Sequence, residues 1–106
     1  MNKIEIEGKL NGKMKRGEYP DGTKIVDFVV ESKGNRRLDR FRITATGNRA
    51  DIIADEMEEG KTVRIIGEIR TGSRKVANAV VIREGKERPL YLPIFDIRAV
   101  KIEFPE

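Results

Sequence analysis

Apolar residues alternate with polar residues along most of this chain, and no other feature constrains its fold as strongly. A period of two places every second side chain on the same face, which is typical of a β-strand with one buried face. The first such stretch has its apolar positions at Ile4, Ile6, Gly8 and Leu10. The same period predicts further strands over residues 24–32, 40–46, 62–70, 75–83 and 90–104. The pattern therefore predicts a mainly β fold.

The period changes once, between residues 48 and 60. Ile52, Ile53 and Met57 recur there at helical spacing, so we expect them to form the buried stripe of a short helix. Asn48 is the expected N-cap, and Gly60 is the expected stop. Because the helix dipole favours negative charge in the first turn, the acidic residues that follow Asn48 support the same assignment.

The elements come in the order of three strands, one helix and then strands again, with a loop over 11–23 and turns over 33–37 and 84–86. This order predicts an OB-fold, a five-stranded antiparallel Greek-key barrel with one helix between strands three and four and an extended late hairpin. An open antiparallel sheet with one helix packed on it is the alternative. The length of 106 residues, without a linker or repeat, predicts a single domain over residues 1–106. The phenylalanines expected in its core are Phe28, Phe41, Phe95 and Phe104.

Residue types that carry most enzyme chemistry are missing from the chain. It contains no cysteine and no histidine, and it has no glycine-rich phosphate loop or nucleophile motif. We therefore expect no catalytic activity, no metal and no cofactor. A cluster of acids is interpreted as the solvated face of the helix: Asp51, Asp55, Glu56, Glu58 and Glu59. The charged N-terminal segment and the lack of a long apolar run predict no signal peptide, no membrane span and a cytoplasmic location.

Positive charge is concentrated outside that acidic stretch. The net charge of +4 understates how basic the rest of the chain is, and such asymmetry favours a polyanionic partner. The candidate phosphate-binding residues lie on a turn and on exposed strand faces: Arg36, Arg37, Arg40, Arg42, Arg64, Arg70, Arg74 and Lys75. The candidate base-stacking residues are Tyr19 in the first loop and Tyr91 in the late hairpin. The alternative is that the arginines are ordinary surface charges and that the tyrosines are surface or packing residues.

Five stretches in the right order resemble the bacterial single-stranded DNA-binding protein (SSB) family. They lie at residues 2–10, 21–30, 41–53, 58–71 and 100–104, and the most specific is EEGKTVRIIGEIRT at 58–71. The resemblance implies an OB-fold that binds single-stranded DNA with little sequence preference, in replication, recombination or repair. It also implies replication or restart proteins as further partners.

The chain departs from the family's pattern at the residues that stack on bases. Arg40 and Thr46 stand where the family presents aromatic side chains, and the chain has no tryptophan. The family's disordered tail, with an acidic tip that recruits partners, has no counterpart before Glu106. The chain is also similar to primosomal protein B and to SSBs of phages or mobile elements. The alternatives are therefore a replication-restart adaptor whose barrel binds proteins, or an RNA-binding OB domain.

The resemblance also implies self-association, because members of the family pair through their first strand. Lys3, Glu5 and Glu7 lie on the exposed face of that strand. Antiparallel pairing centred near Glu5 places Lys3 of one chain opposite Glu7 of the other, an attractive pair that two-fold symmetry repeats. Pairing centred near Ile6 places like charges opposite each other. We therefore expect a homodimer centred near Glu5, and a homotetramer stays open.

Overall fold

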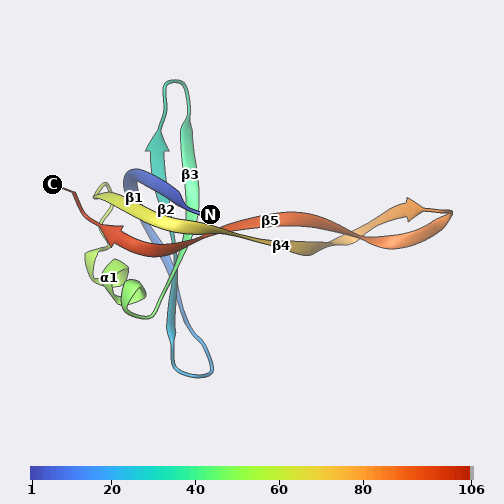
Figure 1. Ribbon diagram of the computed structural model, residues 1–106, viewed down its shortest axis with the longest axis horizontal. Coiled ribbons are helices and arrows are strands. Elements are labelled where there is room, and N and C mark those ends of the chain that lie inside the picture. The colour runs from blue at the N-terminus through green and yellow to red at the C-terminus, as the bar shows by residue number, and fades with distance from the viewer. Residues whose placement is uncertain (106) are drawn as a thin grey trace.

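Five strands close into a barrel, and one helix packs against it (Figure 1). The computed structural model describes residues 1–105. The elements in chain order are β1 (Ile4–Glu18), β2 (Lys24–Lys33), β3 (Leu38–Thr46), α1 (Asn48–Glu56), β4 (Thr62–Arg83) and β5 (Lys86–Glu103). Around the barrel the neighbours are β1, β2, β3, β5 and β4. The predicted order of elements and the closed barrel are confirmed, and the open sheet is wrong.

The prediction of a fully antiparallel barrel is wrong at one pair of strands. β3 and β5 run parallel, with Ile43 opposite Ile97 and Thr44 opposite Arg98. The other neighbouring strands are antiparallel. The reason is geometric, because an odd number of strands in a closed ring cannot alternate in direction all the way round. At least one neighbouring pair must then be parallel.

A small apolar core fills the barrel. Its largest fully buried side chains are Phe28, Leu10, Ile43, Ile53, Ile65, Val30 and Val63. The strand residues among them stand at the inward positions of the alternating pattern, so the sequence correctly predicted which residues of β1, β2, β3 and the start of β4 form the core. α1 buries Ala50 and Ile53 completely, whereas Ile52 is 43% exposed. The buried stripe of α1 is therefore narrower than predicted, because Ile52 lies beside the packed face of the helix.

The ends of α1 also differ from the expected ones. Asn48 begins the helix, and Gly47 occupies the N-cap position at φ 64° without a side-chain hydrogen bond. The helix ends at Glu56, and Gly60 instead belongs to the following turn at φ 85°. Glycine adopts this left-handed backbone region without the strain that a Cβ would cause, which is why both turns use it. No helix within residues 1–105 is long and apolar enough to cross a membrane.

β1 and β4 are both longer than the alternating pattern predicts. Much of the expected loop over residues 11–23 is strand, because β1 continues to Glu18 in antiparallel pairing with β2. An irregularity between Leu10 and Met14 interrupts the alternation there, and it hides the strand from sequence analysis. The segments 62–70 and 75–83, which we expected as separate strands, form one continuous β4.

A two-stranded arm, residues 71–95, extends from the barrel (Figure 1). It is the extended late hairpin that the sequence predicts. The register shifts between Lys75 and Val80, where Asn78 has φ 60°. Glu84 and Gly85 both have positive φ and form the tight turn at the tip of the arm.

The phenylalanines separate the barrel from the arm. Phe28 is buried, and Phe41 and Phe104 pack against the core, as predicted. Phe95 is 70% exposed, so its expected place in the core is wrong. By strand alternation it shares a face with Ile97, which packs against the core. It lies, however, where the strands have left the barrel, and no interior exists there to receive its ring.

Candidate nucleic-acid interface

A groove of about 560 Å³ runs across the outer faces of β2, β3 and β5, and we call it the central groove. Tyr19 from the β1–β2 turn lines one side of it. The arm lines the other side with Arg74, Ile94 and Phe95. The floor is polar and consists of Asp27, Arg42, Thr44, Asp96 and Arg98, with Ile25 beside them. Three elements that are far apart in the sequence therefore enclose one hollow.

The register of the sheet explains why these floor residues meet. Asp27 on β2 is opposite Thr44 on β3, and Thr44 is opposite Arg98 on β5. Lys15 on β1 extends this row, because it is opposite Asp27 on the other side. Directly opposite residues point to the same face of a sheet, so the row forms a band of polar side chains across the outside of four strands.

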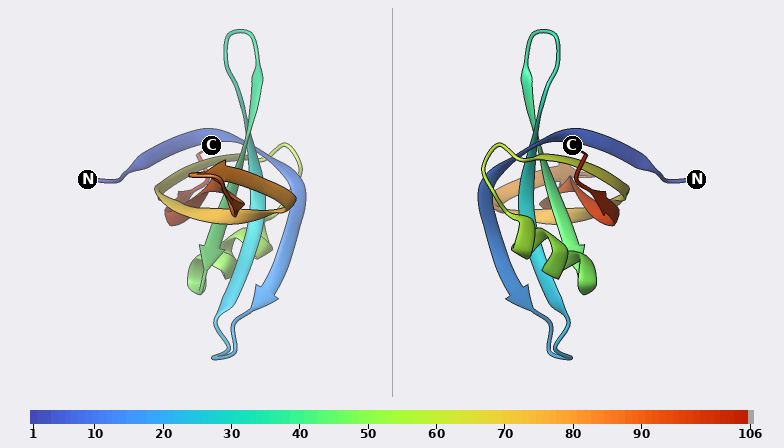
Figure 2. Two further views of the ribbon diagram at one scale, coloured as in Figure 1. Left: turned by 90° about the vertical axis from the view of Figure 1, so that its right-hand side faces the viewer. Right: turned by 90° about the vertical axis from the view of Figure 1, so that its left-hand side faces the viewer.

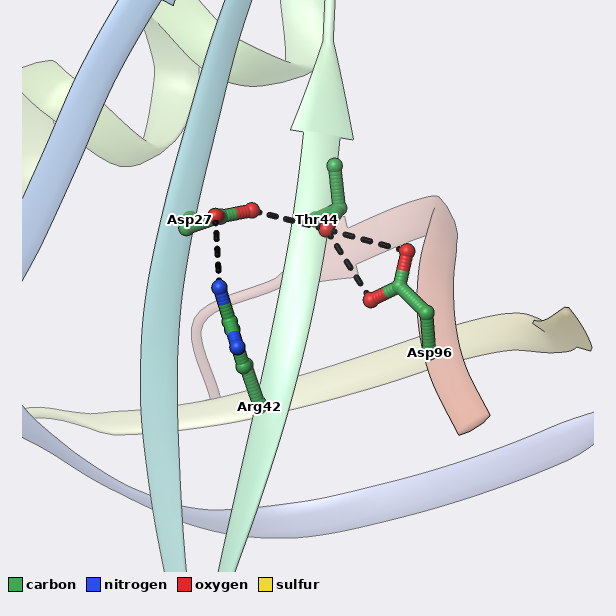
Figure 3. Close-up of polar contacts among 4 residues, drawn as sticks. All are labelled: Asp27, Arg42, Thr44 and Asp96. Carbon is green, nitrogen blue, oxygen red and sulfur yellow. Dashed lines mark hydrogen bonds and ion pairs between the residues drawn. The ribbon is translucent and has the colours of Figure 1, made fainter. Parts of the chain in front are cut away.

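Two carboxylates meet at one hydroxyl group on the floor of the groove (Figure 3). The Thr44 Oγ1 lies 2.8 Å from Oδ1 of Asp27 and 3.1 Å from Oδ1 of Asp96. Arg42 approaches the other side of Asp27, with its Nη2 3.3 Å from Oδ2. Thr44 is only 5% exposed, so its hydroxyl is held in place by packing as well as by these contacts.

The β1–β2 turn fixes the position of Tyr19. The backbone N–H of Tyr19 donates to the carbonyl of Thr23, and the N–H of Gly22 donates to the carbonyl of Tyr19. The Asp21 carboxylate accepts a hydrogen bond from the Thr23 N–H at 2.9 Å, and this contact lowers the pKa of Asp21. Tyr19 itself is 42% exposed, so its ring is available at the edge of the groove.

A second groove of about 380 Å³ continues the first toward β1. The two grooves share Asp27 and Arg42, and the second adds Lys13, Met14 and Lys15. Neither lysine was predicted as a site residue, because the sequence predicts a loop over residues 11–23. Lys13 and Lys15 flank Met14 with the period of a strand, but this alternation is too short to indicate a strand, and the irregularity between Leu10 and Met14 separates it from the strand before it.

Of the residues selected from the sequence, the central groove brings together Tyr19, Arg42 and Arg74. Arg40 lies further along β3 and pairs with Glu31 at 2.9 Å. The β2–β3 turn carries Arg36 and Arg37, and it projects away from the β1–β2 turn that carries Tyr19 (Figure 2). Sequence reasoning missed Phe95 and Arg98, whose places depend on where the arm leaves the barrel.

The remaining candidates on β4 and β5 lie outside the central groove. Arg70 is on the outer face of β4 and pairs with Glu68 at 3.3 Å. Lys75 and Tyr91 stand opposite each other on the arm, and Tyr91 is 57% exposed. They line hollows beside the arm rather than the central groove.

Arg64 has different surroundings, although the alternating pattern places it on an outer face as it does Arg42. Its guanidinium nitrogens lie 3.0 Å from Glu7, 3.5 Å from Glu103 and 3.8 Å from Glu5. Lys101 also pairs with Glu103, and its hydrogen bond, with help from Arg64, lowers the pKa of Glu103. The charge of Arg64 is therefore already matched within the chain.

The first part of β1 is paired along one edge only. Ile4 to Lys9 pair with β4, and pairing with β2 begins at Lys9. Within residues 1–105 the opposite edge of the segment before Lys9 has no strand partner. This is the segment of Lys3, Glu5 and Glu7, and an unpaired edge of this kind is a template for pairing with another chain.

Comparisons with known proteins agree with this architecture. The model of the single-strand binding protein family matches residues 1–84. A curated relative, single-stranded DNA-binding protein 1 of Chlorobaculum tepidum, is 30% identical in an alignment 98 residues long. The match covers 76% of this chain and 60% of the relative. The chain thus spans less than two thirds of that relative's length. A solved structure, the Plasmodium falciparum SSB in complex with ssDNA, matches 100% of this chain and 96% of its own at 18% identity with a TM-score of 0.78. This structural likeness establishes the fold.

Proposed function

Because the chain belongs to the single-strand binding protein family, we propose that it binds single-stranded DNA across the central groove. The observation that carries this proposal is that Tyr19, Arg42 and Arg74 converge on one hollow from three elements. The family consists of DNA-binding proteins that are not enzymes, as the sequence predicts for this chain. Replication, recombination or repair in the cytoplasm is the expected setting.

Binding a flexible strand needs positive charge for the phosphates and flat groups for the bases. Arg74 and Arg42 supply charge on the wall and floor of the central groove, and Lys13 and Lys15 extend it along the second groove. The exposed ring of Tyr19 offers a surface on which a base can stack. The strand then runs from the arm, past Tyr19 and Arg42, toward β1.

Arg42 must exchange partners when a strand binds. Its guanidinium pairs with Asp27 at 3.3 Å, and its side chain is 70% exposed. A surface pair of this kind stabilises the protein by only about 0.2–1 kcal/mol, so a phosphate can take the place of the carboxylate at little cost. The exchange lets Asp27 hold the arginine in position without blocking its use.

A fluorescence titration with oligothymidine at several salt concentrations tests the proposal. Each phosphate that is neutralised in single-stranded DNA contributes about −0.7 to the slope of log affinity against log salt. Contacts from Arg42, Arg74, Lys13 and Lys15 would together give a slope of about −2.8. A slope near zero, or no binding at low salt, would contradict the proposal.

A role as an adaptor for other proteins is the second candidate, and the arm favours it. Val80 is 56% exposed and Ile82 is 72% exposed, and strand alternation places both on one face of the arm. Replacing both with serine should leave affinity for oligothymidine unchanged if this face binds proteins. A fall in that affinity would assign the face to DNA instead.

The RNA-binding alternative is tested by competition with oligouridine in the same assay. If the chain binds RNA, oligouridine should displace the labelled strand as effectively as oligothymidine does.

We also propose that two chains pair through the free edge of β1 to form a homodimer, with a homotetramer as the larger option. Sedimentation at micromolar concentration should show the dimer, and a monomer there would refute it. Lys3→Glu should weaken the dimer, because it places like charges opposite Glu7 of the second chain. Adding Glu7→Lys should restore part of it, since Glu7 also contacts Arg64 within its own chain. If the double variant does not restore the dimer, the proposed register is wrong.

A further inference from the structure

The floor of the central groove contains a carboxylate whose acceptor capacity is not used up. The Thr44 hydroxyl has one proton, so it can donate to Asp27 or to Asp96 but not to both at once. The distance of 2.8 Å to Asp27 is the shorter one. Asp27 also has Arg42 beside it, whereas no ion pair involves Asp96 within residues 1–105. Both oxygens of Asp96 face the Thr44 hydroxyl (Figure 3), at 3.1 and 3.3 Å from its Oγ1. Since a single proton serves at most one of them, Asp96 keeps free lone pairs where it lines the groove.

A carboxylate in this position repels phosphate, so it favours an orientation of the strand in which bases face the floor. The arginine of the groove wall, Arg74, then takes the backbone, and a base held against Tyr19 presents its edge to Asp96. The groups on a base edge that a carboxylate accepts are N–H donors. The part of the floor formed by Asp96 and Arg98 is thus built to contact base edges, whereas Arg42, beside Asp27, contacts the backbone.

A donor completes the pattern next to this acceptor. Arg98 lies two residues further along β5 and lines the same groove, so its guanidinium supplies donors beside Asp96. The pairing edge of guanine presents two adjacent N–H donors, N1 and N2, and one carbonyl acceptor, O6. Two carboxylate oxygens and one guanidinium match that pattern. Thymine offers one N–H between two carbonyls, and adenine and cytosine each offer one amino group beside an acceptor nitrogen.

We propose that Asp96, assisted by Arg98, reads the pairing edge of guanine and gives the chain a preference for guanine within an otherwise sequence-tolerant groove. The inference rests on the proposed function, because it requires that single-stranded DNA occupies the central groove. It assigns a base-reading role to a residue that neither charge nor aromatic character would select. The preference arises from hydrogen bonds, so it adds to the salt-dependent attraction rather than replacing it.

Fluorescence anisotropy with three labelled 12-mers tests the proposal: oligothymidine, alternating dG–dT, and alternating deoxyinosine–dT. Lithium salt keeps the guanines from associating with one another. Deoxyinosine keeps N1–H and O6 but lacks the N2 amino group, so it removes one of the two contacts to Asp96. A good bidentate contact discriminates by at least about fivefold, so the dG–dT strand should bind about fivefold or more tightly than the other two. An equal affinity for dG–dT and deoxyinosine–dT in the unaltered protein would overturn the proposal.

Asp96→Asn provides the second arm, because one acceptor oxygen becomes an amide that donates. The preference for dG–dT should collapse toward equal affinity, while oligothymidine binding persists. Glu31→Gln is the matched control, since Glu31 pairs with Arg40 outside the groove and its loss should keep the preference. A uniform gain in affinity for all three strands would mean that Asp96 acts only through its charge, and it would overturn the proposal. Failure of the unaltered protein to bind any strand would instead refute the proposed function on which this inference rests.

Discussion

Two arginines at equivalent positions of the alternating pattern, Arg42 on β3 and Arg64 on β4, have opposite surroundings. The side chain of Arg42 is 70% exposed and has one carboxylate partner, Asp27 at 3.3 Å. The side chain of Arg64 is 38% exposed and lies within 4 Å of three carboxylates, the nearest being Glu7 at 3.0 Å. The first lines a groove, and the second closes an ion-pair network across β1, β4 and β5.

The difference teaches that strand alternation separates inside from outside but does not distinguish one outer face from another. What decides whether an arginine can bind a phosphate is the number of carboxylates that its neighbouring strands already supply. That number depends on register, because Arg64 is opposite Glu7 on one side and Glu103 on the other. Arg42 is opposite Val29, so its neighbouring strand leaves it less constrained.

The largest effect should come from reversing charge in the central groove. Arg42→Glu combined with Arg74→Glu should lower affinity for oligothymidine by at least about a hundredfold, since each lost charged contact costs about 1.5–3 kcal/mol. Arg64→Gln is the control, and it should leave affinity unchanged while lowering the melting temperature. An equal loss of affinity in the charge-reversal variant and in Arg64→Gln would contradict the distinction between the faces of Arg42 and Arg64. Circular dichroism of each variant checks that the barrel is intact.

The two tyrosines should differ in the same way. Tyr19→Ala should weaken binding by about 1–3 kcal/mol, because its ring lies at the central groove and can stack on a base. Tyr91→Ala should have a smaller effect, because Tyr91 lies beside the arm and outside that groove. Titration with oligothymidine at one salt concentration measures both. A larger loss for Tyr91 would move the path of the strand onto the arm.

Removing a carboxylate should strengthen binding on one face only. Asp27→Asn frees Arg42 from its ion pair and should raise affinity by about twofold to fivefold, the range expected for a surface pair. Glu103→Gln removes a carboxylate from Arg64 and should leave affinity unchanged, because Arg64 does not line the groove. The same titration decides between these outcomes. A gain from both variants would show that only net charge matters.

The alternating pattern was enough to predict the barrel, the place of the helix and the buried faces of the strand segments within the barrel. It could not predict the parallel pair, which follows from ring closure, or the continuation of β1 through its irregularity at residues 10–14. At the site, charge and loop position selected Tyr19, Arg42 and Arg74, which do meet. They also selected Arg64, whose ion pairs cannot be predicted from its neighbours in the sequence. The carboxylates that surround it come from strands distant in sequence. Phe95 was assigned to the core because it stands at an apolar position of the alternating pattern. That pattern carries no information on where the barrel ends and the arm begins.

The smallest effect concerns the pH dependence of the ion-pair network. Lys101, with help from Arg64, lowers the pKa of Glu103 below its ordinary value of 4.5 in the folded chain. A carboxyl group with a lowered folded pKa stabilises the protein above its unfolded pKa and loses that contribution as the pH falls through the folded pKa. The melting temperature should therefore be slightly higher for the parent than for Glu103→Gln at pH 7. The two melting temperatures should converge as the pH falls below about 4.5. A difference that stays constant with pH would contradict this.

The salt dependence of binding tests most directly the claim that Arg42, and not Arg64, contacts the backbone of a bound strand. The slope of log affinity against log salt for oligothymidine should become shallower by about 0.7 in Arg42→Gln, because one phosphate contact is lost. It should stay at the parent value in Arg64→Gln, whose charge is already matched by Glu5, Glu7 and Glu103. An unchanged slope in Arg42→Gln, or an equal reduction in Arg64→Gln, would contradict the account.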